Sequence, residues 1–336
     1  MKTYLEANRL PTVQIGQVEL PRLIMGIHPY DGCSYVDQAR DRENLERFDR
    51  VEKVAQVLRY AVEEEGLTVV QGDHMIPTLN RLHLQAIWET ERQTETQIGL
   101  IAYILVPITL DGVDITYSER AHATLYAYDA RLGGEPFREH IRTDEIIHYI
   151  LDGSWDNLVT PDTVPPFTTA EAARFEIDYA KLEQYLGFFA GCDILIADPG
   201  AEIDLLAMTG RFDLIRDYLA FLRQRFPNVI ASVHHAGVTI PLLEREHIPV
   251  DAYLTPVNKL GLHMFPTREL ALDAIRQATK PVIAIKPLAG GRFLGRQAFD
   301  YVFNEAGVAA TMFGMGTVAQ VKETVGWAKH VLGVVQ

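Results

Sequence analysis

Eight short apolar runs, separated along much of the chain by segments of helical periodicity, constrain the fold of this sequence most strongly. Near-continuous apolar runs of this length are typical of parallel strands that are buried on both faces. Repeated strand–helix alternation implies a parallel sheet, and eight repeats favour closure into a (β/α)8 TIM barrel over an open doubly wound sheet. The predicted strands cover residues 20–27, 67–71, 98–106, 193–197, 229–233, 252–256, 282–285 and 309–313.

The rhythm is broken once, by a long insertion of about residues 108–190 between predicted strands three and four. It contains the proline-rich stretch VTPDTVPPFTT at residues 159–169. Insertions of this size in compact domains are usually functional lids or extra subdomains. The alternative is that it only covers the barrel mouth or a subunit contact. Because α/β barrels commonly exceed about 250 residues as one unit, we expect residues 1–336 to form a single domain.

Charge and composition restrict the partners of the chain. The formal net charge of −14, without a basic stripe, argues against binding to nucleic acid. The two cysteines, Cys33 and Cys192, provide no disulfide framework. Neither a signal peptide nor a membrane span is evident. We therefore expect a cytoplasmic protein that acts on a small-molecule substrate, while its oligomeric state stays open.

Polar side chains follow most of the predicted strands, where barrel enzymes build their active sites. Each could instead cap a helix or bond a loop carbonyl, but so many ionisable groups in one cup are costly unless they pair or bind something. The proposed catalytic residues are Asp73, Asp198, His234 and Lys286. The proposed substrate- or phosphate-binding residues in these loops are His28, His74, His235, Asn258 and Lys259.

Three of these side chains, Asp73, Asp198 and His234, are also candidate ligands for a divalent ion such as zinc or manganese. No HExxH or similar local signature accompanies them. Side chains alternate along a strand, so only one of the adjacent His234 and His235 is expected to face the centre.

The loops after predicted strands seven and eight suit an anion. Gly290, Gly291 and Arg292 follow strand seven, and Gly316 and Thr317 follow strand eight. Glycines let backbone amides approach a phosphate, and a helix that begins at Thr317 would present unpaired amides there. The alternative is that these glycines only make tight turns.

Four segments resemble the aldo/keto reductase superfamily: LPRLIMGIHPYDG (20–32), DILIADP (193–199), KPLAGGR (286–292) and GMGTVAQVKETV (314–325). The resemblance implies a barrel with a nicotinamide cofactor and an Asp, Tyr, Lys and His tetrad. Asp73 lies near the Asp position, but no Tyr follows at the expected spacing, strand three ends without Lys, and Asp198 stands in the place of His. The chain resembles most closely a reductase-like subgroup of no settled activity that lacks the tetrad.

The leading hypothesis from these residues is acid–base or metal-assisted chemistry on a small polar or anionic substrate, of lyase, isomerase or hydrolase type. A divalent metal is preferred to NAD(P) as the cofactor. In this hypothesis Lys286 neutralises an anionic intermediate or forms a Schiff base. One alternative is a nicotinamide-dependent oxidoreductase in which Tyr30 or Tyr103 supplies the missing acid. Another is a non-catalytic ligand-binding barrel.

Overall fold

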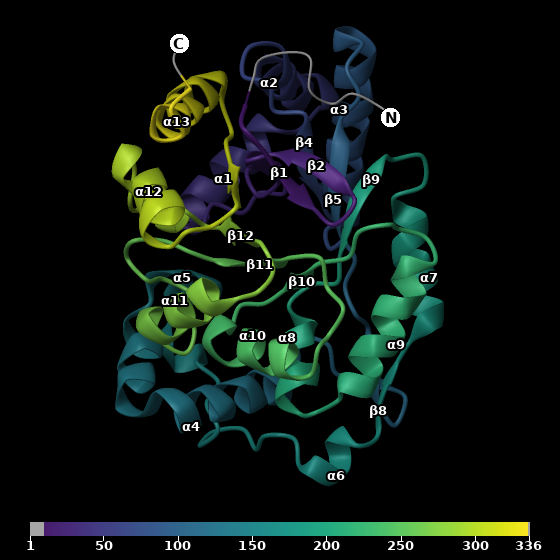
Figure 1. Ribbon diagram of the computed structural model, residues 1–336, viewed down its shortest axis with the longest axis vertical. Helices are drawn as coiled ribbons and strands as arrows, with labels where there is room; N and C mark the ends of the chain where they lie inside the picture. Colours follow the sequence, from purple (N-terminus) through teal and green to yellow (C-terminus); the bar gives the residue numbers. More distant parts are fainter. Residues whose placement is uncertain (1–9, 335–336) are drawn as a thin grey trace.

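The computed structural model describes residues 10–334, and its centre is a barrel of parallel strands (Figure 1). The strands follow one another around the barrel in the order β10-β11-β12-β13-β3-β4-β5-β9. An isolated parallel bridge between Ala197 and Val229 brings the two ends of the sheet together. The eight barrel strands are β3 Leu23–Gly26, β4 Val69–Gly72, β5 Gly99–Tyr103, β9 Ile194–Asp198, β10 Ala231–Ser232, β11 Tyr253–Pro256, β12 Val282–Ile285 and β13 Ala310–Gly314. The predicted TIM barrel is confirmed.

Amphipathic helices surround the barrel, as the periodicity predicts. In α2 the apolar residues Val54, Leu58, Ala61 and Val62 are buried. The same pattern places Ile215, Leu219 and Leu222 of α9 in the core. The helices that follow or flank the strands are α1 Gln38–Arg47, α2 Val51–Glu63, α3 Pro77–Thr94, α8 Glu202–Met208, α9 Phe212–Arg223, α10 Ala236–Arg245, α11 Arg268–Gln277, α12 Arg296–Asp300 and α13 Val318–Val331.

An N-terminal hairpin closes the end of the barrel at which the strands begin. It consists of β1 Thr12–Ile15 and β2 Val18–Pro21, which pair antiparallel. Ile15 and Leu20 of this hairpin are fully buried in the same apolar cluster as the interior strand residues. The predicted first strand is therefore divided between β2 and β3. Because this end is filled, a binding site can form only at the opposite end, where the carboxyl ends of the strands meet.

The insertion between β5 and β9 has secondary structure of its own. Its strands form a small antiparallel sheet in the order β7-β6-β8, and its longest helix, α4, contacts α8 and α10 of the barrel layer. Figure 1 shows α4 running beneath these two helices. The elements are β6 Ile108–Leu110, β7 Val113–Asp114, α4 Glu119–Thr143, α5 Glu145–Ile150, α6 Thr169–Ala172, β8 Phe175–Ile177 and α7 Tyr179–Phe188.

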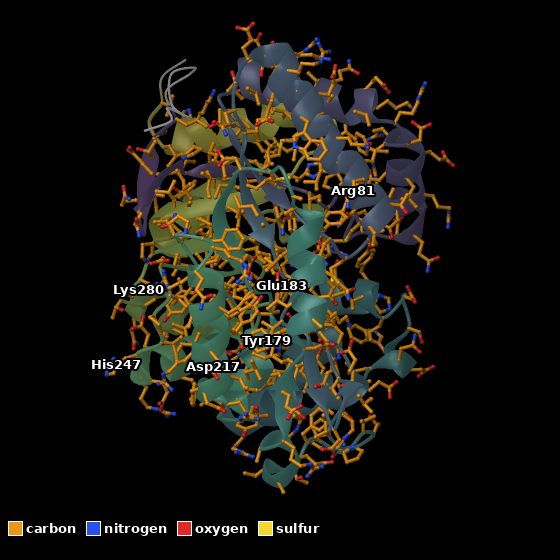
Figure 2. The ribbon with its side chains drawn as sticks, turned by 90° about the vertical axis from the view of Figure 1, so that its right-hand side faces the viewer. Arg81, Tyr179, Glu183, Asp217, His247 and Lys280 are labelled. Atoms are coloured by element: carbon orange, nitrogen blue, oxygen red, sulfur yellow. The ribbon has the colours of Figure 1, made fainter. Side chains whose placement is uncertain are left out.

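The last helix of the insertion, α7, lies beside α9 of the barrel. Figure 2 views this face, with Tyr179 and Glu183 of α7 and Asp217 of α9 labelled. The ring of Tyr179 packs against Phe221 at 5.0 Å between centroids, and Arg225 pairs with Glu183 at 2.5 Å. No helix within residues 10–334 combines the length and the apolar character needed to cross a membrane.

Candidate active site

A cavity of about 650 Å³ lies where the barrel strands end. This volume is in the range of small-molecule sites, roughly 300–1,000 Å³. Loops from both the first and the last barrel strands contribute to it, so residues far apart in sequence share one cup. The residues that line it include the predicted or named candidates His28, Asp73, Tyr103, Asp198, His234, Lys286, Gly290, Gly291 and Gly316, together with Asp31.

Two buried carboxyl groups define one side of the cavity. Asp73 follows β4 and accepts a hydrogen bond from the Met75 amide at 2.7 Å. Asp198 ends β9, where it accepts from the Gly200 amide at 3.0 Å and from the Ser232 hydroxyl at 3.3 Å. Burial raises the pKa of Asp73 to about 6 and the pKa of Asp198 to about 7. Both groups can therefore gain and lose protons near neutral pH, as acid–base chemistry requires.

A tyrosine lies between these carboxyl groups in the barrel order. Tyr103 is the last residue of β5, and its hydroxyl hydrogen-bonds the hydroxyl of Tyr117, which lies between β7 and α4. Burial, together with neighbouring acidic groups, raises the pKa of Tyr103 well above 10. Tyr103 is therefore a neutral phenol that can donate a proton. We call Asp73, Tyr103 and Asp198 the acid side of the cavity.

The opposite side of the cavity carries a lysine. Lys286 directly follows β12, has a positive φ of 56° and places its Nζ 4.8 Å from the centre of the Tyr35 ring. Burial lowers its pKa to about 8. A non-glycine residue in the left-handed region at a cavity is a feature found at functional sites.

The glycine loops border the lysine. Gly290 and Gly291 both have positive φ, 64° and 83°. Helix α13 begins as predicted, because the Thr317 hydroxyl accepts the Gln320 amide at 3.1 Å. The Gly316 amide, however, donates to the Gln320 side chain at 2.8 Å and is not free for a ligand. Lys286 and the Gly290–Gly291 loop form what we call the basic side.

Arg292 does not extend the basic side into the cavity. Its guanidinium pairs with Glu145 of α5 and donates to the Tyr35 carbonyl at 2.6 Å. The side chain is 16% exposed and is not part of the cavity lining. The structure thus uses Arg292 to tie the β12 loop to the insertion, where the sequence predicts an anion contact.

The adjacent histidines lie beyond the end of β10, in the link to α10, and they point in different directions. His234 lines the cavity and stacks on His263 with 4.7 Å between ring centroids. His235 turns into the helix layer, where its Nδ1 lies 2.5 Å from a carboxylate oxygen of Asp129 on α4. His235 therefore joins the insertion to the barrel and does not line the cup.

Three more predicted binding residues lie outside the cavity lining. His74 stacks on Tyr185 at 4.1 Å and accepts the Leu105 amide at 3.3 Å. Asn258 bonds both the amide and the carbonyl of Leu262, and Lys259 pairs with Glu305 at 2.7 Å. Their polar atoms hold loops in place, which is the alternative that a strand-end position always allows.

The expected metal-ligand set does not form. Asp73, Asp198 and His234 line one cavity, yet among residues 10–334 no three His, Cys, Asp or Glu side chains are arranged to hold a metal ion. The metal-assisted variant of the sequence hypothesis thus has no support from the geometry.

Comparison with known proteins bears on the fold. No family model and no curated protein matches this sequence. Among solved structures, one assigned to the aldo-keto reductases of Pseudomonas aeruginosa is 14% identical, with a TM-score of 0.50 over 96% of this chain and 95% of that chain. The chain has the aldo-keto reductase fold. A Bombyx mori aldo-keto reductase solved with NADP is also similar, at 11% identity and a TM-score of 0.48, over 98% of this chain and 94% of that chain.

Within this aldo-keto reductase fold, two residues near Tyr103 had no role assigned from the sequence. Tyr117 belongs to the insertion, and its local sequence gives only a helix-capping signal at Ser118. Glu202, which follows β9, is the first residue of α8, and its local sequence gives no signal of a role in the cavity. Its position beside the two tyrosines depends on three separate chain segments, so no local pattern reports it.

Proposed function

We propose that the protein is a nicotinamide-dependent oxidoreductase that reduces a carbonyl group of a small molecule, with Tyr103 as the proton donor. The observation that carries the proposal is the Tyr103 hydroxyl in the cavity, at the end of β5 and beside the buried carboxyl groups of Asp73 and Asp198. It supports the alternative in which a tyrosine on another strand supplies the missing acid. This reading replaces both the preference for a divalent metal and the preference for non-redox chemistry.

The residues present fit a nicotinamide dinucleotide. The cavity continues from the acid side past Lys286 and the Gly290–Gly291 loop to Trp327 of α13. The Lys286 ammonium would pair with a pyrophosphate oxygen, since a charge-assisted hydrogen bond is the strongest contact available there. Among residues 10–334, a Cβ at Gly291 would have one neighbour within 4 Å, a methyl of Val36 at 3.9 Å, so this backbone is open to a ligand.

When bound, the nicotinamide would supply the hydride that reduces the carbonyl carbon. Tyr103 would hydrogen-bond the carbonyl oxygen and give it the phenolic proton as negative charge develops there. Burial, with Asp73 among the nearby acidic groups, would keep Tyr103 protonated, because both disfavour a free phenolate. His234 would border the substrate from the segment after β10, as a neutral ring, since burial holds its pKa well below 6.5.

The proposal is tested by mixing the protein with NADH or NADPH and a panel of small aldehydes and ketones, and following the loss of reduced nicotinamide. Tyr103→Phe removes only the hydroxyl, so kcat should fall by roughly 10²- to 10⁴-fold, the contribution of a general acid. Cofactor affinity, measured by fluorescence titration, should stay within about twofold because Lys286 and the glycine loop are intact.

Tyr30→Phe is the matched control. The Tyr30 hydroxyl donates to the Met315 carbonyl at 2.8 Å and does not line the cavity, so activity should be retained. Loss of turnover in Tyr30→Phe with retention in Tyr103→Phe would reassign the acid. Failure of either reduced cofactor to bind at micromolar concentration would reject the oxidoreductase itself.

A further inference from the structure

Glu202, the first residue of α8, is a buried carboxyl group that the proposed chemistry leaves unused. Its side chain is 6% exposed, and its Oε2 has no hydrogen-bond partner among residues 10–334. Leaving a buried polar atom unpaired destabilises the fold, and more so when the group is charged. A carboxyl group kept in this way near an active site calls for a functional explanation.

Gly200 shows how close this carboxyl group is to the proposed acid. Gly200 has φ of +80°, and a Cβ there would lie 2.6 Å from Glu202 Oε2 and 2.9 Å from the Tyr103 hydroxyl oxygen. The Glu202 Oε2 and the Tyr103 hydroxyl oxygen therefore lie on either side of the space next to the Gly200 Cα. Tyr117 connects them, since its hydroxyl bonds that of Tyr103 and also lies close enough to the Glu202 carboxyl group to lower the pKa of that group.

Tyr103 cannot keep the negative charge that follows proton transfer. Burial is the main cause that raises its pKa, and the negative charge that Glu202 carries when it is ionised would raise it further. The charge must therefore move to a group of lower pKa. Asp198 is less suited to receive it through a tyrosine, because its two carboxylate oxygens already accept from Gly200 and Ser232.

We propose that Glu202 stores the proton that restores Tyr103, with Tyr117 as the link between them. As the Tyr103 O–H bond breaks and an O–H bond forms on the substrate oxygen, the Tyr117 proton passes to Tyr103 and the Glu202 proton passes to Tyr117. Glu202 ends as the carboxylate and is reprotonated by solvent after product release. Glu202 acts through Tyr117 and does not touch the substrate. This inference rests on the proposed carbonyl reduction.

The electrostatic surroundings of Glu202 agree with a stored proton. Burial raises its pKa to about 8, and the nearby Tyr117 hydroxyl moderates that increase. The ionisable groups that face it come from four other directions as well as from its own helix. They are Tyr103 of β5, Tyr117 of the insertion, Asp198 of β9, Tyr218 of α9 and Asp204 of α8. All of these neighbours are acidic or phenolic, so the neutral carboxylic acid is the favoured form at pH 7.

The first test needs no cofactor. Infrared spectra of the whole protein at pH 6 should contain a protonated-carboxyl band that is missing in Glu202→Gln and that disappears from the wild type near pH 8. In Tyr117→Phe the band should remain but shift in frequency, because the neighbouring hydroxyl is lost. Absence of the band at pH 6 overturns proton storage, and an unshifted band in Tyr117→Phe overturns the link.

The second test is kinetic. Glu202→Gln and Tyr117→Phe should each lower kcat roughly tenfold to a hundredfold with KM within about twofold, because Glu202 lies outside the cavity lining and Tyr117→Phe keeps the ring that lines it. The double variant should be no slower than either single variant, since both break the same path. The wild-type kcat should fall as the pH rises through about 8, and this limb should be absent in both variants.

The failure of this inference can be told apart from failure of the proposed function. Full kcat and an unchanged pH limb in Glu202→Gln, while Tyr103→Phe is inactive, would reject Glu202 and keep the reductase. A wild type that reduces no carbonyl compound would reject the reductase and with it this relay, whatever the infrared band reports. Additive losses in the double variant would mean that the two residues act separately, which also rejects the relay.

Discussion

The two sides of the cavity are built by different means. On the acid side, Tyr103 and Asp198 are the last residues of barrel strands, so hydrogen bonding in the sheet fixes their backbones. On the basic side, Lys286, Gly290 and Gly291 all have positive φ in the loop after β12. The barrel itself thus positions the groups proposed for chemistry, whereas a loop positions those proposed for binding. Rigid elements give the more precise placement, and loops adapt more readily to a ligand.

Burial shifts the pKa values on the two sides in opposite directions, and in both cases it destabilises the charged form. Burial raises the pKa of Asp198 and penalises its ionised form, but burial lowers the pKa of Lys286 and penalises its protonated form. Stability contributed by Asp198 is present at low pH and is lost as the pH rises through the folded-state pKa. Stability contributed by Lys286 is present at high pH and is lost as the pH falls through its folded-state pKa. Near neutrality both groups cost stability, a common cost of functional sites.

Asp198→Asn should give the largest stability effect. Because the pKa of Asp198 rises from 3.8 to about 7, the folded protein keeps the ionised carboxylate at a cost of roughly 4 kcal/mol. Asparagine avoids this cost, so the variant should be more stable than the wild type at pH 8 by up to that amount. At pH 4 the gain should disappear, because the wild-type carboxyl group is then neutral in the folded state.

Urea denaturation at pH 4, 6 and 8 measures this effect. Asp217→Asn, at an exposed position of α9, is the control that should show no such trend. A gain of equal size at every pH would mean that packing, and not the ionisation of Asp198, distinguishes the variant. In that case ionisation of Asp198 would not destabilise the folded protein, and the contrast with Lys286 on the basic side would be wrong.

Lys286→Met should act in the opposite pH direction and more weakly. The lysine is partly exposed, so solvent reduces the penalty implied by its lowered pKa. We expect the free energy of unfolding to rise by about 1–2 kcal/mol at pH 6, and this gain should vanish above pH 10.

The same variant should bind reduced nicotinamide roughly tenfold to a hundredfold more weakly, the usual contribution of a hydrogen bond to a charged group. Urea denaturation and fluorescence titration measure the two quantities. Unchanged cofactor affinity would remove Lys286 from the basic side.

The sequence predicts the barrel well because each parallel strand is apolar on both faces, which local composition records directly. Its error at the first strand has a physical cause: β2 and β3 are two apolar segments joined at Arg22, so the hairpin strand reads as part of the barrel strand. The site is predicted less completely. Strand ends bring Asp73, Asp198 and His234 to one cavity, since the carboxyl ends of parallel strands meet there.

What the sequence could not predict depends on partners far away in the chain. His235 faces Asp129 of the insertion, more than one hundred residues earlier, and Arg292 faces Glu145. Tyr117 hydrogen-bonds Tyr103 from the far end of the antiparallel β6–β7 hairpin. An ionisable side chain at a strand end can serve the cavity or the loop packing, and the choice is made by segments that local pattern does not describe.

Gln320→Ala should give the smallest effect and tests how far the basic side extends. The Gln320 side chain accepts the Gly316 amide at 2.8 Å, and Gly316 lines the cavity. The change removes one hydrogen bond, so the free energy of unfolding should fall by about 1 kcal/mol. It also frees the Gly316 amide at the start of α13, where inorganic phosphate should bind equally well or up to about threefold more tightly. Calorimetric titration with phosphate measures this, with Lys286→Met as the comparison. If Gln320→Ala weakened phosphate as much as Lys286→Met, the capped amide and not the lysine would organise the anion site, and the basic side would have to be redrawn around α13.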